Sequence, residues 1–451
     1  MAENAAGYAE RRALQILVLI PVVKIINGRK GLIQGFPIQG KGAAKLFEAG
    51  IKVSQLGIDV ALKHHRISGD SSHGGHLLFL IFFSIQLNLP SIFGMIGKKR
   101  SPVSMISTKG DTSMKHILLL GTGGTIACKH GDSGLTPLLT GDELLSYVPA
   151  ARSFCEVEAI QVLNIDSTNI HPKHWQLLCQ VLEENYDNYD GFVICHGTDT
   201  MAYTASALSF MLEGLNKPVI LTGSQLPIGV LRTDGKENLL TSIEIATARH
   251  SGGRPIVPEV CIFFENHLMR GNRTTKINAE NFNAFRSYNY PVLASAGIHI
   301  KYNNVQIHTE NTHGQLRPHY LLDTDIAILK LFPGIQESVV DAILAIKGLK
   351  AVVLETYGSG NAPRKEWFLR RLHDACEQGV VIVNVTQCNA GTVEMERYET
   401  GYRLMQAGVV CGYDSTTESA VTKLMFLLGH NYSPAEVREL MNRPIAGEIT
   451  I

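Results

Sequence analysis

The feature that constrains the fold most is a strand-like run, Ile117–Leu120, that ends in a glycine-rich turn, Gly121–Thr125. A continuous apolar run of this length is typical of a buried parallel strand. Glycine lets such a turn take a positive φ and lets backbone N–H groups approach a ligand closely. In an open α/β sheet, ligands bind at the carboxyl ends of the strands. The stretch therefore predicts a parallel sheet with a functional loop at this strand exit.

Three chemistries use turns of this kind, and the residues narrow the choice. A dinucleotide-binding turn needs glycine or alanine at the sixth position counted from Gly121, and that position is Ile126. A phosphate loop of the Walker type needs Gly-Lys-Ser/Thr, which the turn lacks. What remains is a hydroxyl nucleophile, Thr122 or Thr125, at the strand exit. The alternative is a plain βα turn whose threonines cap the next element.

From Met114 onward, strand-like and helical patterns alternate, which is typical of parallel sheets with right-handed crossovers. The predicted strands are Ile117–Leu120, Ala159–Leu163, Phe192–Cys195, Val219–Thr222, Glu259–Phe264, Ile326–Leu331, Ala351–Glu355 and Val380–Val385. The predicted helices are Thr140–Tyr147, His174–Glu184, Thr200–Leu212, Lys236–Thr247, Val339–Lys347, Lys365–Glu377, Thr416–Leu428 and Pro434–Arg443. We therefore predict an α/β protein with two domains, each a mainly parallel sheet flanked by helices. The larger N-terminal domain spans 114–302, a linker 303–321, and the smaller C-terminal domain 322–451.

Residues 1–113 differ from the rest of the chain. They contain no Cys and no Trp, and they carry 14 Lys and Arg against 6 Asp and Glu. The run 77–96 is long enough to span a bilayer, but Gln86, Asn88 and Pro90 fall in its middle, where polar groups are costly. We favour an N-terminal extension that is poorly ordered or lies ahead of a true start at Met114, outside the native core. Membrane association is the less favoured interpretation.

Composition excludes several classes of function. Beyond residue 113 the chain has 27 Lys and Arg against 35 Asp and Glu, so nucleic acid is not an expected partner. All eight cysteines lie in this part, none forms a CxxC pair, and metal-ligand spacing is missing. Reduced core thiols and a cytoplasmic setting are therefore expected, rather than a disulfide framework.

Other strand exits also carry polar groups. Thr198 and Asp199 follow the strand that ends at Cys195, and the alternative is that they cap the next helix. Asn164–Asn169 is a polar strand end suited to a small substrate, and Ser224 follows another strand. Lys276 ends a cationic loop; such a lysine can activate a neighbouring threonine or hold a carboxylate, although an exposed loop cation is the commoner meaning.

Together these stretches resemble the signature segments of the bacterial-type L-asparaginases, most closely the type I, cytoplasmic branch. The segments are Gly121–Ile126, His196–Thr204 and Arg270–Lys276. The resemblance runs from about Met114 to the C-terminus. It implies a cytoplasmic homodimer or homotetramer that hydrolyses L-asparagine to L-aspartate and ammonia, without metal or cofactor, through a threonine-linked acyl-enzyme.

The resemblance also implies roles for single residues. Thr125 matches the nucleophilic threonine of the first loop, and Thr198, Asp199 and Lys276 match the second threonine and its activating pair. Which threonine attacks first is open in the family, and we favour Thr125. The predicted substrate-binding residues are Asp166, Ser167 and Thr168, for the α-amino and α-carboxylate groups, and Ser224, near the side-chain amide.

One position departs from the family pattern. Leu135 stands where many members have a tyrosine that lies over the nucleophile. Our hypothesis is that Tyr357 supplies the phenol from the second domain, either within the chain or across a subunit interface; the alternative is a packed strand-end tyrosine. A regulatory asparagine site of some type I members is matched weakly by Thr275, Lys301, Thr386, Gln387 and Cys388.

Two other functions compete with the amidohydrolase. The asparaginase-like subunit of the archaeal tRNA-dependent amidotransferase also has an N-terminal extension and lacks the loop tyrosine. Its extension should show the short alternating strands of a small barrel, a pattern that residues 1–113 lack. The other competing function is that of an amino-acid sensor, which keeps the binding pocket but has lost catalysis because of Leu135.

Overall fold

The computed structural model describes residues 59–65, 80–86, 114–131, 134–308 and 315–451. The chain divides into two compact units, residues 1–107 and 108–451. In the first unit, β1 (Asp59–His65) pairs antiparallel with β2 (Leu80–Gln86). The remainder of 1–113, including most of the run 77–96, lies outside the described residues. The predicted order and membrane association of this segment therefore stay predictions. In the described part of the chain, no helix is both long enough and apolar enough to cross a membrane.

An eight-stranded sheet organises the N-terminal domain, in the order β15-β14-β11-β10-β9-β7-β3-β6. Its strands are β3 (Lys115–Gly123), β6 (Cys155–Ile165), β7 (Gly191–Cys195), β9 (Val219–Thr222), β10 (Val260–Phe264), β11 (His267–Arg270), β14 (Ala294–Ser295) and β15 (Lys301–Tyr302). The five strands from β10 to β6 are parallel, and β11, β14 and β15 are antiparallel. The carboxyl ends of β9, β7, β3 and β6 therefore meet at one edge.

Strand side chains alternate between two cores, one on each face of this sheet. On β3, Ile117 and Leu119 enter one core, while Leu118 and Leu120 enter the other. The first core is covered by α2 (Gly141–Ser146) and α5 (Gly235–Thr247), and the second by α3 (Pro172–Glu184) and α4 (Met201–Met211). Burial on both faces explains why the strands read as unbroken apolar runs.

Helix boundaries follow from local chemistry. Thr140 caps α2 in a capping box with Glu143. On α3 the buried residues recur at helical spacing, so one face packs on the sheet; they are Trp175, Leu178, Cys179 and Leu182. Helix α4 is buried almost all round, because it lies between the sheet and the C-terminal domain.

The C-terminal domain is a four-stranded parallel sheet in the order β17-β18-β19-β20, with helices on both faces. Its strands are β17 (Ile326–Lys330), β18 (Ala351–Thr356), β19 (Val381–Thr386) and β20 (Val410–Cys411). Helices α6 (Glu337–Leu344), α7 (Glu366–Glu377) and α8 (Glu399–Gln406) contribute to one core, and α9 (Thr417–Gly429) and α10 (Pro434–Met441) to the other. The predicted two-domain α/β fold is confirmed.

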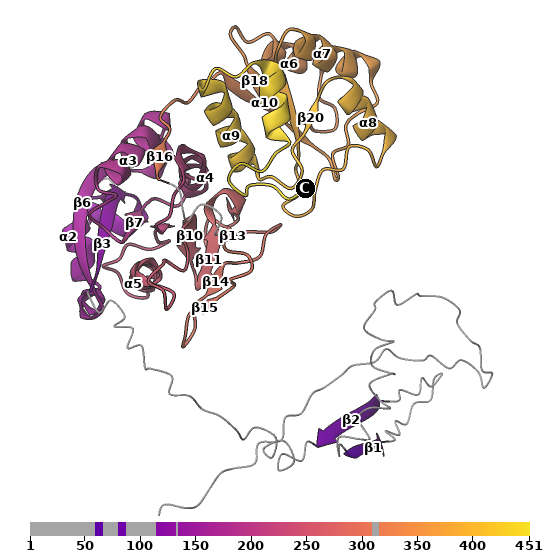
Figure 1. Ribbon diagram of the computed structural model, residues 1–451. Helices are drawn as coiled ribbons and strands as arrows, with labels where there is room; N and C mark the ends of the chain where they lie inside the picture. The colour runs from indigo at the N-terminus through magenta and orange to yellow at the C-terminus, as the bar shows by residue number, and fades with distance from the viewer. Residues whose placement is uncertain (1–58, 66–79, 87–113, 132–133, 309–314) are drawn as a thin grey trace, which may run out of the picture. The chain divides into compact units, whose positions relative to one another are not determined.

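The two domains pack through α4 and α9, which lie side by side (Figure 1). Tyr203 on α4 and Met425 on α9 contact both the N-terminal and the C-terminal cores. In the connection, β16 (Arg317–Pro318) pairs with β8 (Leu212–Glu213) directly after α4. Residues 309–314 of the predicted linker lie outside the described residues, and the domain boundaries stay predictions.

Several elements were not predicted from the sequence. They are the short strands β11, β14, β15 and β20, the helix α8, the hairpin of β4 (Cys128–Gly131) with β5 (Gly134–Pro137), and the pair β12 (Thr275–Lys276) and β13 (Phe285–Arg286). Most are two to four residues long, and runs this short carry too few residues for a periodicity to be read.

A fully buried ion pair anchors the C-terminal segment. Lys423 of α9 contacts Glu448, and both side chains are at most 1% exposed. Lys423 Nζ also donates to the carbonyl oxygens of Met441 and Arg443, and Glu448 accepts from two backbone N–H groups. Neither charge is left without a partner, which is the condition under which a buried pair is tolerated.

We predict that Glu448→Gln lowers the free energy of unfolding by about 3 kcal/mol, because it leaves the Lys423 ammonium buried without a countercharge. Urea unfolding measures the change. Asp325→Asn, which removes an exposed partner of Lys350, is the control and should cost less than about 1 kcal/mol. Equal losses in the two variants would contradict the prediction.

Candidate active site

The exits of the neighbouring strands β3 and β7 touch through their backbones. Gly124 follows β3 and has φ +74°; an ideal Cβ on it would lie 2.3 Å from Gly197 Cα. Gly197 follows β7, and its own Cβ would lie 3.1 Å from Gly124 Cα. No side chain fits at either position. Since Thr125 and Thr198 come directly after these glycines, the contact brings the two threonine loops together.

The third loop, after β6, joins the same cluster. Ser167 is buried, and its Oγ would lie 2.6 Å from a Cβ on Gly197. Thr200 Oγ1 donates a 2.8 Å hydrogen bond to Ser167 O. Before Ser167, the Asp166 carboxylate accepts from the backbone N–H and the hydroxyl of Thr168, at 2.8 Å each. Asp166 and Thr168 are exposed, so this loop presents polar groups to solvent.

Ser224, after β9, lies on the other side of the first loop. An ideal Cβ on Gly235, at the start of α5, would lie 3.2 Å from Ser224 Cβ and 3.3 Å from Ile126 Cγ1. Ile126 is the residue after Thr125, in a 3₁₀ helix that spans Thr125–Ala127. The four predicted exits therefore converge on one edge of the sheet.

Lys276 reaches this edge from outside the sheet. Its Nζ donates to Thr198 Oγ1 at 2.8 Å and to Asp199 Oδ1 at 2.6 Å. The Lys276 side chain is 19% exposed, and that of Asp199 is 55% exposed. An ammonium, a hydroxyl and a carboxylate thus form a hydrogen-bonded set at the solvent-facing side of the site. Such a set can move a proton to or from the hydroxyl.

Gln225 is a site residue that the sequence analysis missed. Thr198 Oγ1 donates to Gln225 Oε1 at 3.3 Å, and Gln225 Nε2 donates to Asn281 O. The Asp234 carboxylate fixes the Gln225 backbone by accepting its N–H at 2.9 Å. Burial raises the pKa of Asp234, and these hydrogen bonds oppose the rise. The only signal for this loop was the strand exit before Ser224.

The buried side chain of His196 holds the backbone of the Thr198 loop by a hydrogen bond. His196 Nδ1 faces Gly197 O at 2.7 Å, and Nε2 faces Thr204 Oγ1 at 2.9 Å. Trp175 Nε1 donates to the same Thr204 hydroxyl at 3.0 Å. Burial lowers the pKa of His196 to about 4. The ring is therefore neutral, with Nδ1 donating to the carbonyl.

The predicted substitute for the loop tyrosine is not brought to this site by the contacts described. Leu135 lies on β5, opposite His130 of β4, and its side chain is exposed. Tyr357 packs against the core of the C-terminal domain and pairs with Asn361. Within the described residues its phenol oxygen is buried with no hydrogen-bond partner. The role of Tyr357 stays a prediction.

The predicted regulatory residues form two groups that are neighbours through Glu355, and a single exposed position. Thr386 Oγ1 donates to Gly358 O and accepts from Cys388 N. Gln387 Nε2 donates to the carbonyl oxygens of two strand ends, and Thr275 Oγ1 donates to Glu418 of α9 at 2.6 Å. Lys301 lies on β15, the edge strand of the large sheet. No contact described here joins the three, and the regulatory site stays a prediction.

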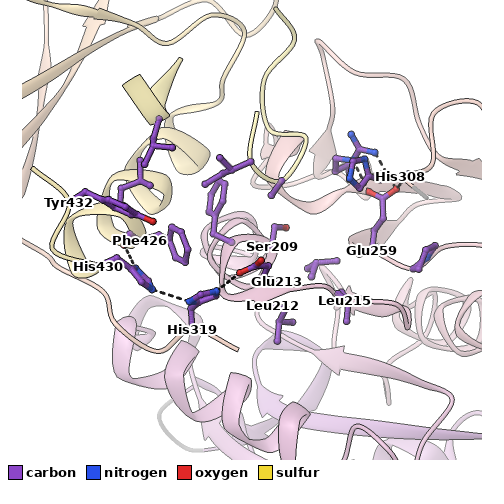
Figure 2. A pocket seen from close by; sticks show the side chains of 18 residues that line it. Ser209, Leu212, Glu213, Leu215, Glu259, His308, His319, Phe426, His430 and Tyr432 are labelled. Atoms are coloured by element: carbon purple, nitrogen blue, oxygen red, sulfur yellow. Dashed lines mark hydrogen bonds and ion pairs between the residues drawn. The ribbon is translucent and has the colours of Figure 1, made fainter. Parts of the chain in front are cut away.

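Two cavities of ligand size lie elsewhere. One, of about 400 Å³, is lined by the end of α4, the linker, α9 and the C-terminal segment; Glu213, His319 and His430 form a hydrogen-bonded row at its rim (Figure 2). The other, of about 280 Å³, includes Tyr357 and Trp367. Neither is lined by Thr125, Thr198 or Lys276, and the chemistry we assign depends on the convergent polar groups rather than on either cavity.

Both domains of the chain match known family models. The family model "Asparaginase, N-terminal" matches residues 116–308, and "Glutaminase/Asparaginase C-terminal domain" matches residues 325–441. L-asparaginase 1 of Escherichia coli (strain K12) is 43% identical over 342 residues, which cover 74% of this chain and 98% of that relative.

Two further proteins extend the comparison. A human protein named 60 kDa lysophospholipase is 40% identical over 352 residues, which cover 76% of this chain and 60% of that protein. The crystal structure of L-asparaginase I from Vibrio cholerae matches with a TM-score of 0.68 and 41% identity, over 75% of this chain and all of that one. The family models begin at residue 116, so they leave out the N-terminal segment.

We predict that Gly124→Ala lowers the free energy of unfolding by on the order of 3 kcal/mol, because the added Cβ meets the Gly197 backbone at a strained positive φ. Urea unfolding measures the loss. Gly252→Ala is the matched control, since a Cβ there meets nothing within 4 Å. A Gly124→Ala protein as stable as the control would contradict the close approach of the two loops.

We also predict an acid destabilisation from His196. Its pKa is about 4 in the folded protein and 6.5 unfolded, so the unfolded state gains a proton that the folded state does not. The contribution is present above pH 6.5 and is lost as the pH falls to 4, by on the order of 3 kcal/mol. Unfolding of the wild type and of His196→Gln is compared at pH 7 and pH 4.5. An equal loss in both would contradict the assignment.

Proposed function

This chain belongs to the asparaginase family, and from that premise we propose that it hydrolyses L-asparagine to L-aspartate and ammonia through a threonine-linked acyl-enzyme. The observation that carries the proposal is the contact of Lys276 Nζ with both Thr198 and Asp199, beside the backbone contact that brings Thr125 to the same edge. A family member without this set would keep the fold but not the means of activating a hydroxyl or a water molecule.

In the first half-reaction, Thr125 Oγ1 attacks the side-chain amide carbon of asparagine. The hydroxyl passes its proton to the hydrogen-bonded set of Thr198, Lys276 and Asp199, and the amide oxygen takes the negative charge. Backbone N–H groups of a strand-exit loop stabilise that oxyanion. The carbon–nitrogen bond then breaks, the nitrogen takes a proton and leaves as ammonia, and an aspartyl ester remains on the threonine.

In the second half-reaction, water attacks the ester carbon. Thr198, held between Lys276 Nζ and Gln225 Oε1, lies in a hydrogen-bonded set that can accept the proton of water and return it to the leaving threonine oxygen. The products are L-aspartate and the free hydroxyl. The family resemblance favours Thr125 as the first nucleophile; Thr198, already engaged by Lys276 and Gln225, suits the proton-transfer role better.

Substrate recognition is assigned to the loops around these threonines. Asp166 and Thr168 are exposed at the mouth and suit the α-amino and α-carboxylate groups, together with Ser167. Ser224, beside the first loop, suits the side-chain amide. Glutamine, one methylene longer, is expected to be the weaker substrate. The proposed reaction uses no metal and no cofactor.

The cellular setting is proposed on the same grounds. The cysteines are free, and most are buried, as expected for a cytoplasmic protein. By the family resemblance, the protein acts as a homodimer or homotetramer. In such an assembly Tyr357 could supply its phenol to a neighbouring subunit, and this remains our hypothesis for the missing tyrosine at Leu135.

The test is ammonia release from asparagine and from glutamine, without tRNA or a partner protein, by the full chain. We expect turnover of asparagine, a loss of about 10³-fold or more in kcat for Thr125→Ala and for Lys276→Met, and little change for Thr247→Ala, a threonine of α5. Acid quenching should trap the aspartyl ester on a peptide that contains Thr125. An ester on Thr198 would exchange the two roles, and asparagine binding without ammonia would overturn the proposal.

A further inference from the structure

The segment that carries Lys276 is tied to the C-terminal segment by side-chain hydrogen bonds. Just before Lys276, the side chains of Arg270, Asn272 and Arg273 are nearly fully buried. Asn272 Nδ2 donates to Ala446 O at 2.8 Å, and Arg273 Nη1 donates to Glu448 O at 2.6 Å. These bonds join chain positions about 175 residues apart, so they are tertiary anchors rather than local turns.

Arg273 makes the densest of these contacts. Its guanidinium forms a bidentate pair with Asp414, with Nη1–Oδ1 2.7 Å and Nη2–Oδ2 2.9 Å. Nη2 also donates to Thr450 Oγ1 at 2.6 Å, while Thr450 N donates back to Asp414 Oδ1 at 2.8 Å. The Arg273–Asp414 pair is buried, bidentate and charge-assisted, so it fixes both the position and the orientation of its members, and Thr450 closes the ring from the exposed side.

Each end of the ring is itself held. Asp414 lies in the turn that leads into α9. In the C-terminal segment, Glu448 lies between Ala446 and Thr450 and forms an ion pair with Lys423 of α9. On the side nearer the reacting groups, Thr275 Oγ1 donates to Glu418 of the same helix at 2.6 Å. Lys276 is the next residue, and its Nζ ends at Thr198 and Asp199. The lysine is therefore supported by α9 and the tail.

We propose that Arg273, together with Asp414 and the C-terminal segment Ala446–Thr450, is a positioning device that sets the reach of Lys276 to Thr198 and Asp199. This inference rests on the proposed hydrolase function. None of the contacts described for these residues involves Thr125, Thr198 or Asp199, so their effect reaches the reacting groups through the segment that carries Lys276. Of the asparagine-binding loops, the one after β6 has no hydrogen bond described to the Lys276 segment, and the one after β9 touches it at Asn281 but is held by the Asp234 carboxylate. Loosening the ring should therefore lower kcat and leave KM for asparagine nearly unchanged.

The decisive variant is Arg273→Lys. One ammonium cannot form the bidentate pair with Asp414 and also reach Glu448 O and Thr450 Oγ1. Arg249→Lys is the matched control: Arg249 is a partly buried arginine, bonded to the backbone and paired with Asp190, but it lies in the N-terminal domain after α5. Both variants are assayed for kcat and KM per folded molecule, with thermal melting to measure the folded fraction.

We expect Arg273→Lys to lower kcat by about 10- to 100-fold with little change in KM, as a displaced catalytic group does, while Arg249→Lys loses stability only. Thr450→Val, which removes one hydroxyl from the ring, should lower kcat in the same direction by less, and it carries the test if Arg273→Lys does not fold. Equal kcat in the ring variants and in Arg249→Lys, or a change in KM alone, overturns the inference. A wild type that releases no ammonia overturns the proposed function itself.

Discussion

The backbone contact between Gly124 and Gly197 is the constraint on which the candidate site depends. Parallel strands bring their carboxyl ends to one edge, but neighbouring exit loops normally hold side chains that keep them apart. Here two glycines face each other, and the gap between the loops closes to the distance of two backbones. One residue beyond each glycine is a threonine. The parallel sheet places the two threonine loops at one edge, and the two glycines let the loops come into backbone contact.

The charged part of the site has a different origin. Lys276 is held outside the sheet, on a segment packed between α4 and the C-terminal domain. Because this segment covers one side of α4, the helix is buried almost all round. The alanine and serine side chains of α4 are small, so Gly271 can approach Ala205 closely. The second domain therefore does more than cover the first, because the support for the cationic side of the site is built from it.

Sequence patterns predicted the parallel strands of the large sheet, since burial on both faces leaves apolar runs such as Ile117–Leu120, but not its short antiparallel strands. The exits followed from topology, because parallel strands must end at one edge. The partners of those exits could not be read in the same way. Arg273 and Asp414 lie 141 positions apart, and neither carries a local signal of the other. Gln225 was passed over because its role depends on the position of Thr198, which only the packed loops determine.

In the mechanism we propose, the departure at Leu135 changes how a proton must leave Thr125. In the described part of the chain the hairpin of β4 and β5 places an exposed leucine where a phenol is expected, and the contacts of Tyr357 lie within the C-terminal domain. Leucine can neither accept nor relay a proton. Within one chain, the backbone contact brings the Thr125 loop beside the loop of Thr198, whose hydroxyl is bonded to Lys276, and Lys276 is bonded to Asp199. Both half-reactions would then depend on the same three residues. A displacement of Lys276 would therefore slow both the formation and the hydrolysis of the acyl-enzyme.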